Sequence, residues 1–113
     1  MGKIILLEAD VKRLQDIKTF IAENLDQELS AAMIADKFTM GKSTLRRHFS
    51  TYFGNTLYHF ILQTRMEHAM SLLKRKASSI NDIAIAVGYK EVSSFSRAFA
   101  KYYGQPPFYF LQQ

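Results

Sequence analysis

The segment STLRRHFSTYFG, residues 43–54, returns fifty positions later as SSFSRAFAKYYG, residues 93–104. Five positions are identical (Ser, Arg, Phe, Tyr and Gly), and three more are conservative exchanges (Thr/Ser, Leu/Phe and Phe/Tyr). The shared large apolar side chains stand at positions 45, 49, 52 and 53, and again at 95, 99, 102 and 103, which is the spacing of one helical face. The duplication therefore predicts one amphipathic helix that the chain uses twice.

The shared polar side chains lie on another face of this helix. Ser43 and Arg47, like Ser93 and Arg97, are one turn apart and clear of the apolar stripe. The simplest alternative is that both arginines are merely solvated, but their retention in both copies favours a functional role. Two copies of one polar face indicate a repeated ligand.

Composition limits the classes of protein that the chain can represent. Its 113 residues make one domain, or two very small ones that share a core, and 48% of them are hydrophobic. The absence of cysteine excludes disulfides, thiolate metal sites and cysteine nucleophiles. The longest aliphatic run, Ile4 to Leu7, is too short to span a bilayer, and the N-terminus lacks a secretory signal. We expect a soluble, cytoplasmic protein.

The formal net charge of +5 is unevenly distributed. Residues 1–30 carry four basic and six acidic side chains, a net −2, whereas residues 31–113 carry eleven and four, a net +7. The positive charge therefore belongs to the duplicated part, where a polyanion would bind.

Hydrophobic periodicity and helix-capping signals predict an all-α fold. We expect a helix over 11–25 with Asp10 as its N-cap, a second helix capped by Ser30, and a turn at 39–41. The first repeated helix follows at 42–53, and a long helix runs from Asn55 or Thr56 to about Leu73. A short helix over 81–87, the second repeated helix to Tyr103, and a last turn over 108–111 complete the chain.

The repeat extends beyond the twelve residues. Ile34-Ala35 matches Ile83-Ala84 at an offset of 49, whereas everything after the turn matches at an offset of 50. Each copy is therefore a short helix, a tight turn and a longer helix, with one extra residue in the second turn. This is the layout of a helix-turn-helix, whose second helix enters a major groove.

Three motifs of the second copy resemble the DNA-binding domain of the AraC/XylS family of bacterial transcription regulators. They are INDIAIAVGY at 80–89, SFSRAF at 94–99 and YGQPP at 103–107, and the resemblance covers residues 11 to 111. It implies about seven helices in a homeodomain-like tandem of two helix-turn-helix subdomains. These are residues 11–54 and 77–113, joined by a linker helix within 55–76, while residues 1–10 form a linker or tag remnant. Each subdomain would place a recognition helix in one of two successive major grooves.

The resemblance also implies which side chains meet the DNA. Base contacts fall on Ser43, Arg46 and Arg47 in the first recognition helix, and on Val92, Ser93, Ser96 and Arg97 in the second. Arginine can hold guanine O6 and N7 with both prongs, and serine can bond to a base edge or a phosphate. Lys42, Lys90 and Lys101 lie near the same faces and suit phosphate contacts.

Several positions depart from the family pattern, and three of them bear on the recognition helices and their turns. Thr39 stands where the second copy has Gly88, and because a β-branched residue tolerates positive φ poorly, we expect a different backbone in the first turn. Gly41 offers no side-chain cap to the first recognition helix. Glu91 suits a helix N-terminus but would repel a phosphate if it faces DNA.

Other residues have structural interpretations. The aromatic groups around Phe49 and Phe99 are expected in the core rather than as base-stacking platforms, and Arg65 in a structural ion pair with Asp82 or Glu67. The run at 74–76 suits a solvated helix end and a phosphate contact equally. The three histidines have no metal-ligand spacing, and the duplicated serines have no His–Asp partners. We therefore expect no metal, no cofactor and no catalysis.

The sequence leaves a second function open. A helical protein-interaction module that contacts the transcription machinery is the alternative to duplex-DNA binding, and RNA polymerase is a further candidate partner of a DNA-binding module. The run Ile4 to Leu7 is consistent with the end of a linker from an absent N-terminal effector or dimerisation domain, and Met1-Gly2 with a cloning remnant. A DNA-repair methyl acceptor would need a cysteine, which the chain lacks. A DNA-binding regulator would be associated with the nucleoid.

Overall fold

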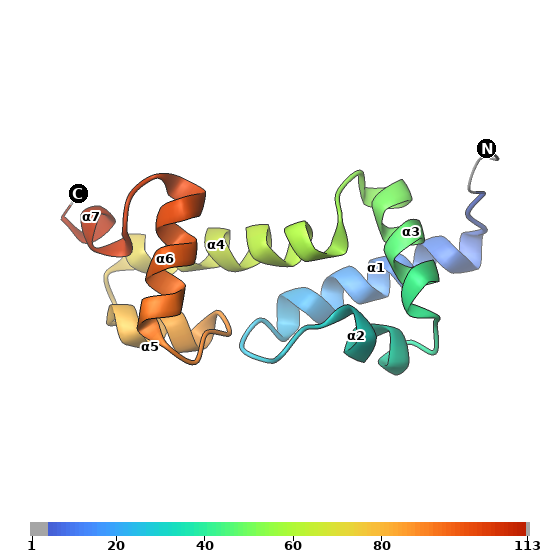
Figure 1. Cartoon of the computed structure of the whole chain (residues 1–113), viewed down its shortest axis with the longest axis horizontal. Helices are drawn as coiled ribbons and strands as arrows, with labels where there is room; N and C mark the ends of the chain where they lie inside the picture. Colours follow the sequence, from blue (N-terminus) through green and yellow to red (C-terminus); the bar gives the residue numbers. More distant parts are fainter. Residues whose placement is uncertain (1–4, 113) are drawn as a thin grey trace. The chain divides into compact units, whose positions relative to one another are not determined.

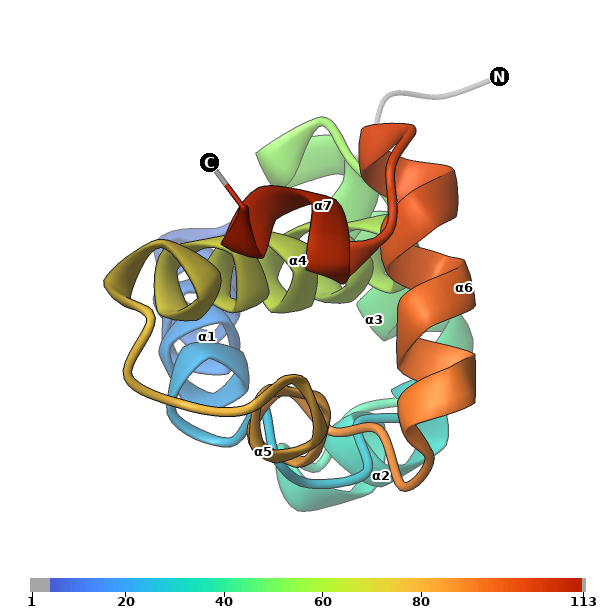
Figure 2. The same cartoon turned by 90° about the vertical axis from the view of Figure 1, so that its left-hand side faces the viewer.

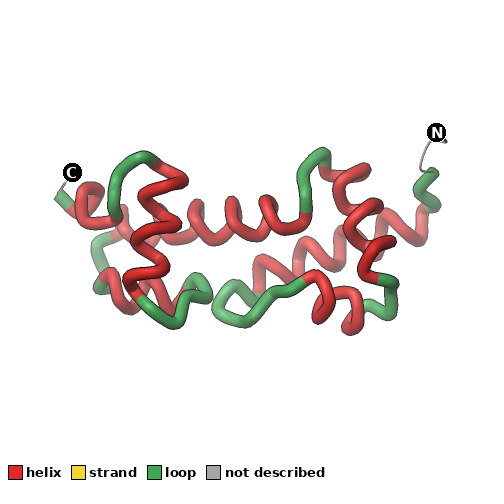
Figure 3. The backbone as a smooth tube through the Cα atoms, in the orientation of Figure 1, coloured by secondary structure: helices red, strands yellow, loops and turns green. Residues whose placement is uncertain are grey.

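The structure, a computed structural model, describes residues 5–112, and within this range it contains helices and no strand (Figures 1 and 3). The helices are α1 (Glu8–Glu23), α2 (Ala31–Lys37), α3 (Lys42–Phe53), α4 (Leu57–Arg75), α5 (Ile80–Ala86), α6 (Val92–Tyr103) and α7 (Pro107–Leu111). The predicted all-α class and the count of about seven helices are confirmed. The possible cloning remnant and the first residue of the aliphatic run lie outside the described residues.

The chain divides into two compact units. The first comprises residues 1–24 and 29–62, and the second comprises residues 25–28 and 63–113. The division falls inside α4, so this helix supplies residues to both units. The second unit also includes a short segment, residues 25–28, from the connection between α1 and α2.

In the first unit, α1 and α2 both pack against α3. The buried side chains of α1 are Leu14, Ile17 and Ile21, which recur at helical spacing as predicted. Asp10 is not the N-cap, because α1 begins at Glu8, within the stretch 1–10 that the sequence assigns to a linker or tag remnant. The Asp10 carboxylate instead accepts a hydrogen bond from the Leu7 backbone N–H at 3.0 Å. An acid near the start of a helix can be the N-cap or the third helical residue, and in this structure Asp10 is the third helical residue.

In the second unit, α5 and α7 pack against α6, with α5 near the N-terminal part of α6 and α7 near its C-terminal part (Figure 2). Phe95 and Phe99 of α6 are fully buried, as is Ile83 of α5. Each unit thus has its own apolar core, to which one of the two repeated helices, α3 or α6, contributes its buried face.

Three hydroxyl side chains cap helices, and of these the sequence analysis predicts Ser30 as a cap and Thr56 as a possible helix start. Ser30 accepts from the Met33 N–H and Ser79 from the Asp82 N–H, each at 3.1 Å, and Thr56 accepts from the His59 N–H at 3.1 Å. Such caps satisfy N–H groups that have no partner inside the helix. They set the starts of α2, α5 and α4.

The aromatic residues pack in two equivalent clusters. Phe49 lies with its ring centroid 4.5 Å from Phe53 and 5.3 Å from Phe60. Fifty positions later, Phe99 lies 4.7 Å from Tyr103 and 5.7 Å from Phe110. Phe49 and Phe99 have no exposed surface, so the prediction of core packing rather than base stacking is confirmed for them.

The two turns that join the short and long helices share one backbone path. In the first, the Thr39 and Met40 N–H groups donate to Asp36 and Ala35; in the second, the Gly88 and Tyr89 N–H groups donate to Ile85 and Ala84. These pairs keep the offset of 49, whereas the N-caps, Gly41 and Glu91, are separated by 50. The extra residue of the second turn is therefore Lys90.

The expectation of a different backbone at Thr39 is wrong. Thr39 has φ of 56° and Gly88 has φ of 94°, so both lie in the left-handed region. A β-branched residue pays a conformational cost there, and the hydrogen bonds that close the turn hold it in place. The first turn keeps its shape despite the residue.

Candidate nucleic-acid interface

The N-terminal half of α3 presents polar side chains away from the core. Leu45 and Phe49 are fully buried, whereas Lys42, Ser43, Arg46 and Arg47 are exposed. The buried residues follow the spacing i, i+4, so Ser43 and Arg47, one turn apart, lie on the opposite face with Arg46 beside them, while Lys42 is in the first turn. The three predicted base-reading side chains of this helix are therefore brought together on one accessible surface.

The second recognition helix repeats this pattern with different chemistry. Val92, Ser93 and Arg97 are exposed on α6, and Ser96 is half-buried. Ser93 and Arg97 correspond to Ser43 and Arg47, and they have the same exposure as their counterparts. The Arg46 position is occupied by Ser96, so α6 has one arginine where α3 has two.

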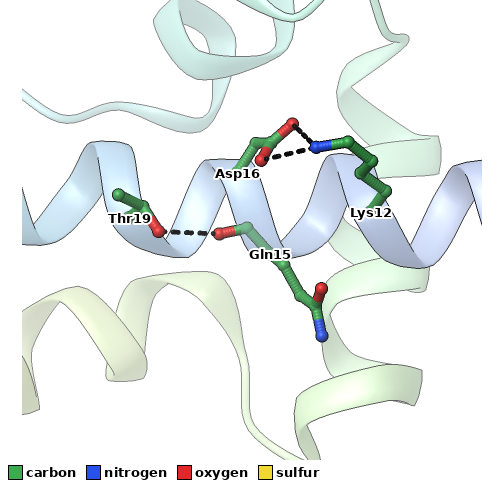
Figure 4. A network of polar contacts seen from close by, with 4 residues as sticks. All are labelled: Lys12, Gln15, Asp16 and Thr19. Atoms are coloured by element: carbon green, nitrogen blue, oxygen red, sulfur yellow. Dashed lines mark hydrogen bonds and ion pairs between the residues drawn. The ribbon is translucent and has the colours of Figure 1, made fainter.

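The arginines of the two helices have no anionic partners in the part of the chain that the structure describes. An ion pair on the surface of α1 joins Lys12 to Asp16, at 3.5 Å, beside a hydrogen bond from the Thr19 hydroxyl to the Gln15 carbonyl (Figure 4). Lys12 is thus locally compensated, whereas the α3 and α6 arginines keep an uncompensated positive charge available to an anionic ligand.

The predicted phosphate-contacting lysines occupy three different positions in the fold. Lys42 is the first residue of α3, Lys90 is the inserted residue of the α5–α6 turn, and Lys101 lies one turn beyond Arg97 on α6. All three are exposed. Lysines around the rim of a base-reading face suit phosphate contact because the ammonium acts as a point charge with no fixed geometry.

Glu91 is the N-cap of α6, but its side chain makes no capping hydrogen bond. The backbone there is extended, with φ of −123° and ψ of 132°. In the first copy the N-cap is Gly41, also without a side-chain cap. The two recognition helices therefore begin with different groups, an exposed carboxylate in one and no side chain in the other.

Arg65 of α4 supports the α5–α6 turn from inside the second unit. Its Nη2 donates to the Gln27 backbone carbonyl at 2.7 Å. The predicted partners were Asp82 or Glu67, so the structural role holds but the partner is a carbonyl of the 25–28 segment. Burial lowers the pKa of the Arg65 guanidinium, and the nearby Tyr89 partly opposes this effect.

Gly88 leaves the space that this arrangement needs. A Cβ added there would lie 2.4 Å from the Leu25 carbonyl oxygen and 2.8 Å from Arg65 Nη2. The next residue, Tyr89, packs its ring 5.7 Å from that of Phe95, a buried residue of α6. The turn is thereby held between the 25–28 segment and the core of the recognition helix.

Sequence reasoning missed two of these contributors. Gln27 binds Arg65 through its backbone carbonyl, which no side-chain pattern could reveal. Gln15 of α1 donates through Nε2 to the Tyr52 hydroxyl of α3 at 3.1 Å and so ties the first recognition helix to α1. The glutamine lies on the exposed side of α1, outside the apolar pattern from which the helices were predicted.

Within residues 5–112, no three histidine, aspartate or glutamate side chains gather into an arrangement that could hold a metal ion. Nor does any helix there have both the length and the apolar character required to cross a membrane.

Two helix-turn-helix units, each with an exposed and uncompensated basic helix, define a DNA-binding transcription regulator. A family model described as a helix-turn-helix domain matches residues 34–113. The chain belongs to this AraC-type helix-turn-helix family.

Known relatives support this assignment. The regulatory protein SoxS of Escherichia coli (strain K12) is 34% identical over 96 residues, which span 85% of this chain and 90% of SoxS. The melibiose operon regulatory protein of the same strain is 33% identical over 88 residues, but this match spans only 29% of that protein. The chain is thus similar to SoxS over nearly its whole length and to one part of the longer regulator.

Solved structures share the fold. The C-terminal domain of AraT, a response regulator from Geobacillus stearothermophilus, superposes with a TM-score of 0.84 at 27% identity, covering 88% of this chain and 84% of that one. The DNA-binding domain of AdpA, solved in complex with a target DNA, has a TM-score of 0.82 at 19% identity and covers 88% and 90%. The second likeness concerns the fold alone.

Proposed function

We propose that this protein binds duplex DNA in a sequence-specific manner, with α3 and α6 as recognition helices in two successive major grooves. The observation that carries the proposal is the duplicated pair of exposed side chains, Ser43 with Arg47 and Ser93 with Arg97, on equivalent helices of two helix-turn-helix units. A structural duplication would preserve the core, whereas this one also preserves the polar face. The AdpA domain, a protein of the same fold, was solved with its target DNA.

Base reading is assigned to Ser43, Arg46 and Arg47 on α3, and to Val92, Ser93, Ser96 and Arg97 on α6. Arg47 and Arg97 are the principal readers, because a guanidinium can donate two hydrogen bonds to guanine and thereby exclude the other bases. Lys42, Lys90 and Lys101 neutralise phosphates, which contributes affinity that is independent of sequence and weakens with salt.

The two grooves that such a monomer reads are one helical turn apart. We expect two short blocks of conserved bases about 34 Å, or about ten base pairs, apart. The first block is read by the subdomain at 11–54 and the second by the subdomain at 77–113, with the linker helix within 55–76 between them.

Selection on a random duplex library at near-physiological salt tests this function. The retained DNA is sequenced, and two enriched blocks at about ten base pairs are the expected outcome. Retention without any enriched sequence, lost as the salt concentration rises, would contradict sequence-specific binding. In that case the alternative of a protein-interaction module would explain the family fold better.

Further partners belong to the same proposal. We infer that the regulator contacts RNA polymerase through a surface outside its recognition faces, and exposed apolar side chains on α5 and α7 support this. Ile85 is 53% exposed, Phe108 is 59% and Tyr109 is 42%. Co-purification of RNA polymerase, and its loss in Phe108→Ala, would test the polymerase contact.

The proposal also includes an effector or dimerisation domain preceding α1, and association with the nucleoid in the cytoplasm.

A further inference from the structure

The two recognition helices differ most at their N-terminal ends. At offset 50, Gly41 and Lys42 of the first copy correspond to Glu91 and Val92 of the second. One helix therefore begins with no side chain and a cation, and the other begins with a carboxylate and a branched apolar side chain. In helix-turn-helix proteins, the N-terminal residues of the recognition helix reach the base edges.

The Glu91 carboxylate has no partner among the residues that the structure describes. It makes no capping hydrogen bond, and it is exposed. When α6 enters a major groove, a carboxylate next to a phosphate is repelled, so its stable position is over a base that offers a hydrogen-bond donor. The donors in the major groove are the amines of cytosine N4 and adenine N6.

Cytosine suits a carboxylate better than adenine does. Adenine places the N7 acceptor beside its amine, and this acceptor repels the second carboxylate oxygen, whereas cytosine presents the N4 amine without an adjacent acceptor. Glu91 is therefore matched to cytosine, and it would discriminate against guanine, whose groove edge carries acceptors alone.

Val92 places an apolar side chain next to the Glu91 carboxylate. It is 39% exposed, although it is branched and apolar, and it stands directly beside Glu91 at the first position of α6. The apolar group that a base pair presents in the major groove is the C5 methyl of thymine. Val92 contacting this methyl would remove both apolar surfaces from water.

We propose that Glu91 and Val92 form a pyrimidine-reading corner on α6, in which Glu91 accepts from cytosine N4 and Val92 contacts a thymine methyl. This inference rests on the proposed DNA-binding function and adds a direction to it. α3 lacks both groups and carries Arg46 and Arg47 as base readers, so its half-site selects guanine and has no position read by a carboxylate. The binding site is then asymmetric, and the protein binds it in one orientation.

The test is a library selection with four proteins: the unchanged chain, Glu91→Gln, Val92→Ala and a matched control, Glu23→Gln. Glu23 is an exposed acid and the last residue of α1, so its substitution removes the same charge from a different helix. The unchanged chain is expected to enrich guanine opposite Arg47 and Arg97 in both half-sites, and to enrich cytosine and thymine in the α6 half-site alone. Glu91→Gln is expected to exchange the cytosine for adenine, since glutamine bonds adenine N6 and N7 in a bidentate manner, while Glu23→Gln keeps the cytosine.

A second measurement isolates the methyl group. Replacing the selected thymine by deoxyuridine should weaken the unchanged chain roughly fourfold, the effect of one buried methyl group, and should leave Val92→Ala nearly unaffected. The corner is refuted if Glu91→Gln still selects cytosine, or if the unchanged chain binds thymine and deoxyuridine equally. Guanine enrichment opposite Arg47 and Arg97 reports the proposed function separately, so that function can hold when the corner fails. Loss of all enrichment would overturn both.

Discussion

Thr39 and Gly88 occupy equivalent positions in the two helix-turn-helix turns and share a left-handed backbone, with φ of 56° and 94°. Their surroundings differ. Thr39 is exposed, whereas a side chain at Gly88 would collide with the Leu25 carbonyl and the Arg65 guanidinium. One turn therefore tolerates a residue that the other excludes, although the two backbones follow the same path.

Thr39→Gly should stabilise the first unit. Glycine removes the cost of holding a β-branched residue in the left-handed region, about 1–2 kcal/mol. It also increases the conformational freedom of the unfolded chain, which reduces this gain in stability by roughly 0.5–1 kcal/mol. We expect the free energy of unfolding in urea to rise by about 1 kcal/mol. An unchanged or lower value would show that the threonine side chain stabilises the turn.

Gly88→Ala should destabilise the second unit strongly. The methyl group adds the left-handed cost of about 1–2 kcal/mol to a steric conflict with the Leu25 carbonyl, of about 1–3 kcal/mol for forced overpacking. Urea unfolding should therefore show a loss of roughly 2–5 kcal/mol. Gly104→Ala is the control, since its Cβ would meet nothing within 4 Å at φ of 82°, and it should show the conformational cost alone.

Arg97→Ala should weaken binding to the selected DNA by about 1–3 kcal/mol and relax the preference at one base position. Lys101→Ala, one turn away on the same helix, should instead weaken binding to all sequences alike and reduce the salt slope by about 1. Titrations on the selected duplex and on a scrambled one, at several salt concentrations, distinguish the two roles. An equal loss on both duplexes for Arg97→Ala would remove its base-reading role.

Alkaline pH should destabilise the second unit through Tyr103. Burial, together with the neighbouring Tyr102 and Glu67, raises the pKa of the Tyr103 hydroxyl above its ordinary value of 10.0. The unfolded state then loses its proton first, so the stabilising contribution is complete below pH 10 and falls as the pH rises toward the folded-state pKa. Tyr103→Phe, which copies Phe53 of the first unit, should flatten this decline in unfolding experiments above pH 10. Tyr58→Phe, at a tyrosine that is 77% exposed, should leave the decline in place.

The positions of most helices were predictable because each one depends on nearby residues. The repeated helices begin and end where the pattern placed them, at Lys42–Phe53 and up to Tyr103, since apolar spacing and a terminal glycine are local signals. The start of α1 was not predicted, because Asp10 can occupy either the N-cap or the third helical position, and the choice depends on how the preceding residues lie.

For the candidate site, the sequence predicted which side chains are exposed but not which of them lack a partner. Exposure of Ser43 and Arg47, and of Ser93 and Arg97, follows from the core face opposite them. The unpartnered state of Glu91 was beyond prediction, because an acid at an N-cap often accepts hydrogen bonds from the helix N–H groups, and only the structure shows that this one does not.

The sequence by itself determined the class of fold, the duplication and the two polar faces, because helical periodicity is written in residues three and four positions apart. The tertiary structure decided which groups meet across long distances in the chain. Arg65 bonds to the Gln27 carbonyl, and Gly88 lies under the Leu25 carbonyl, through backbone atoms that every residue possesses. A side-chain pattern carries no record of such partners, since their approach depends on the packing of whole helices.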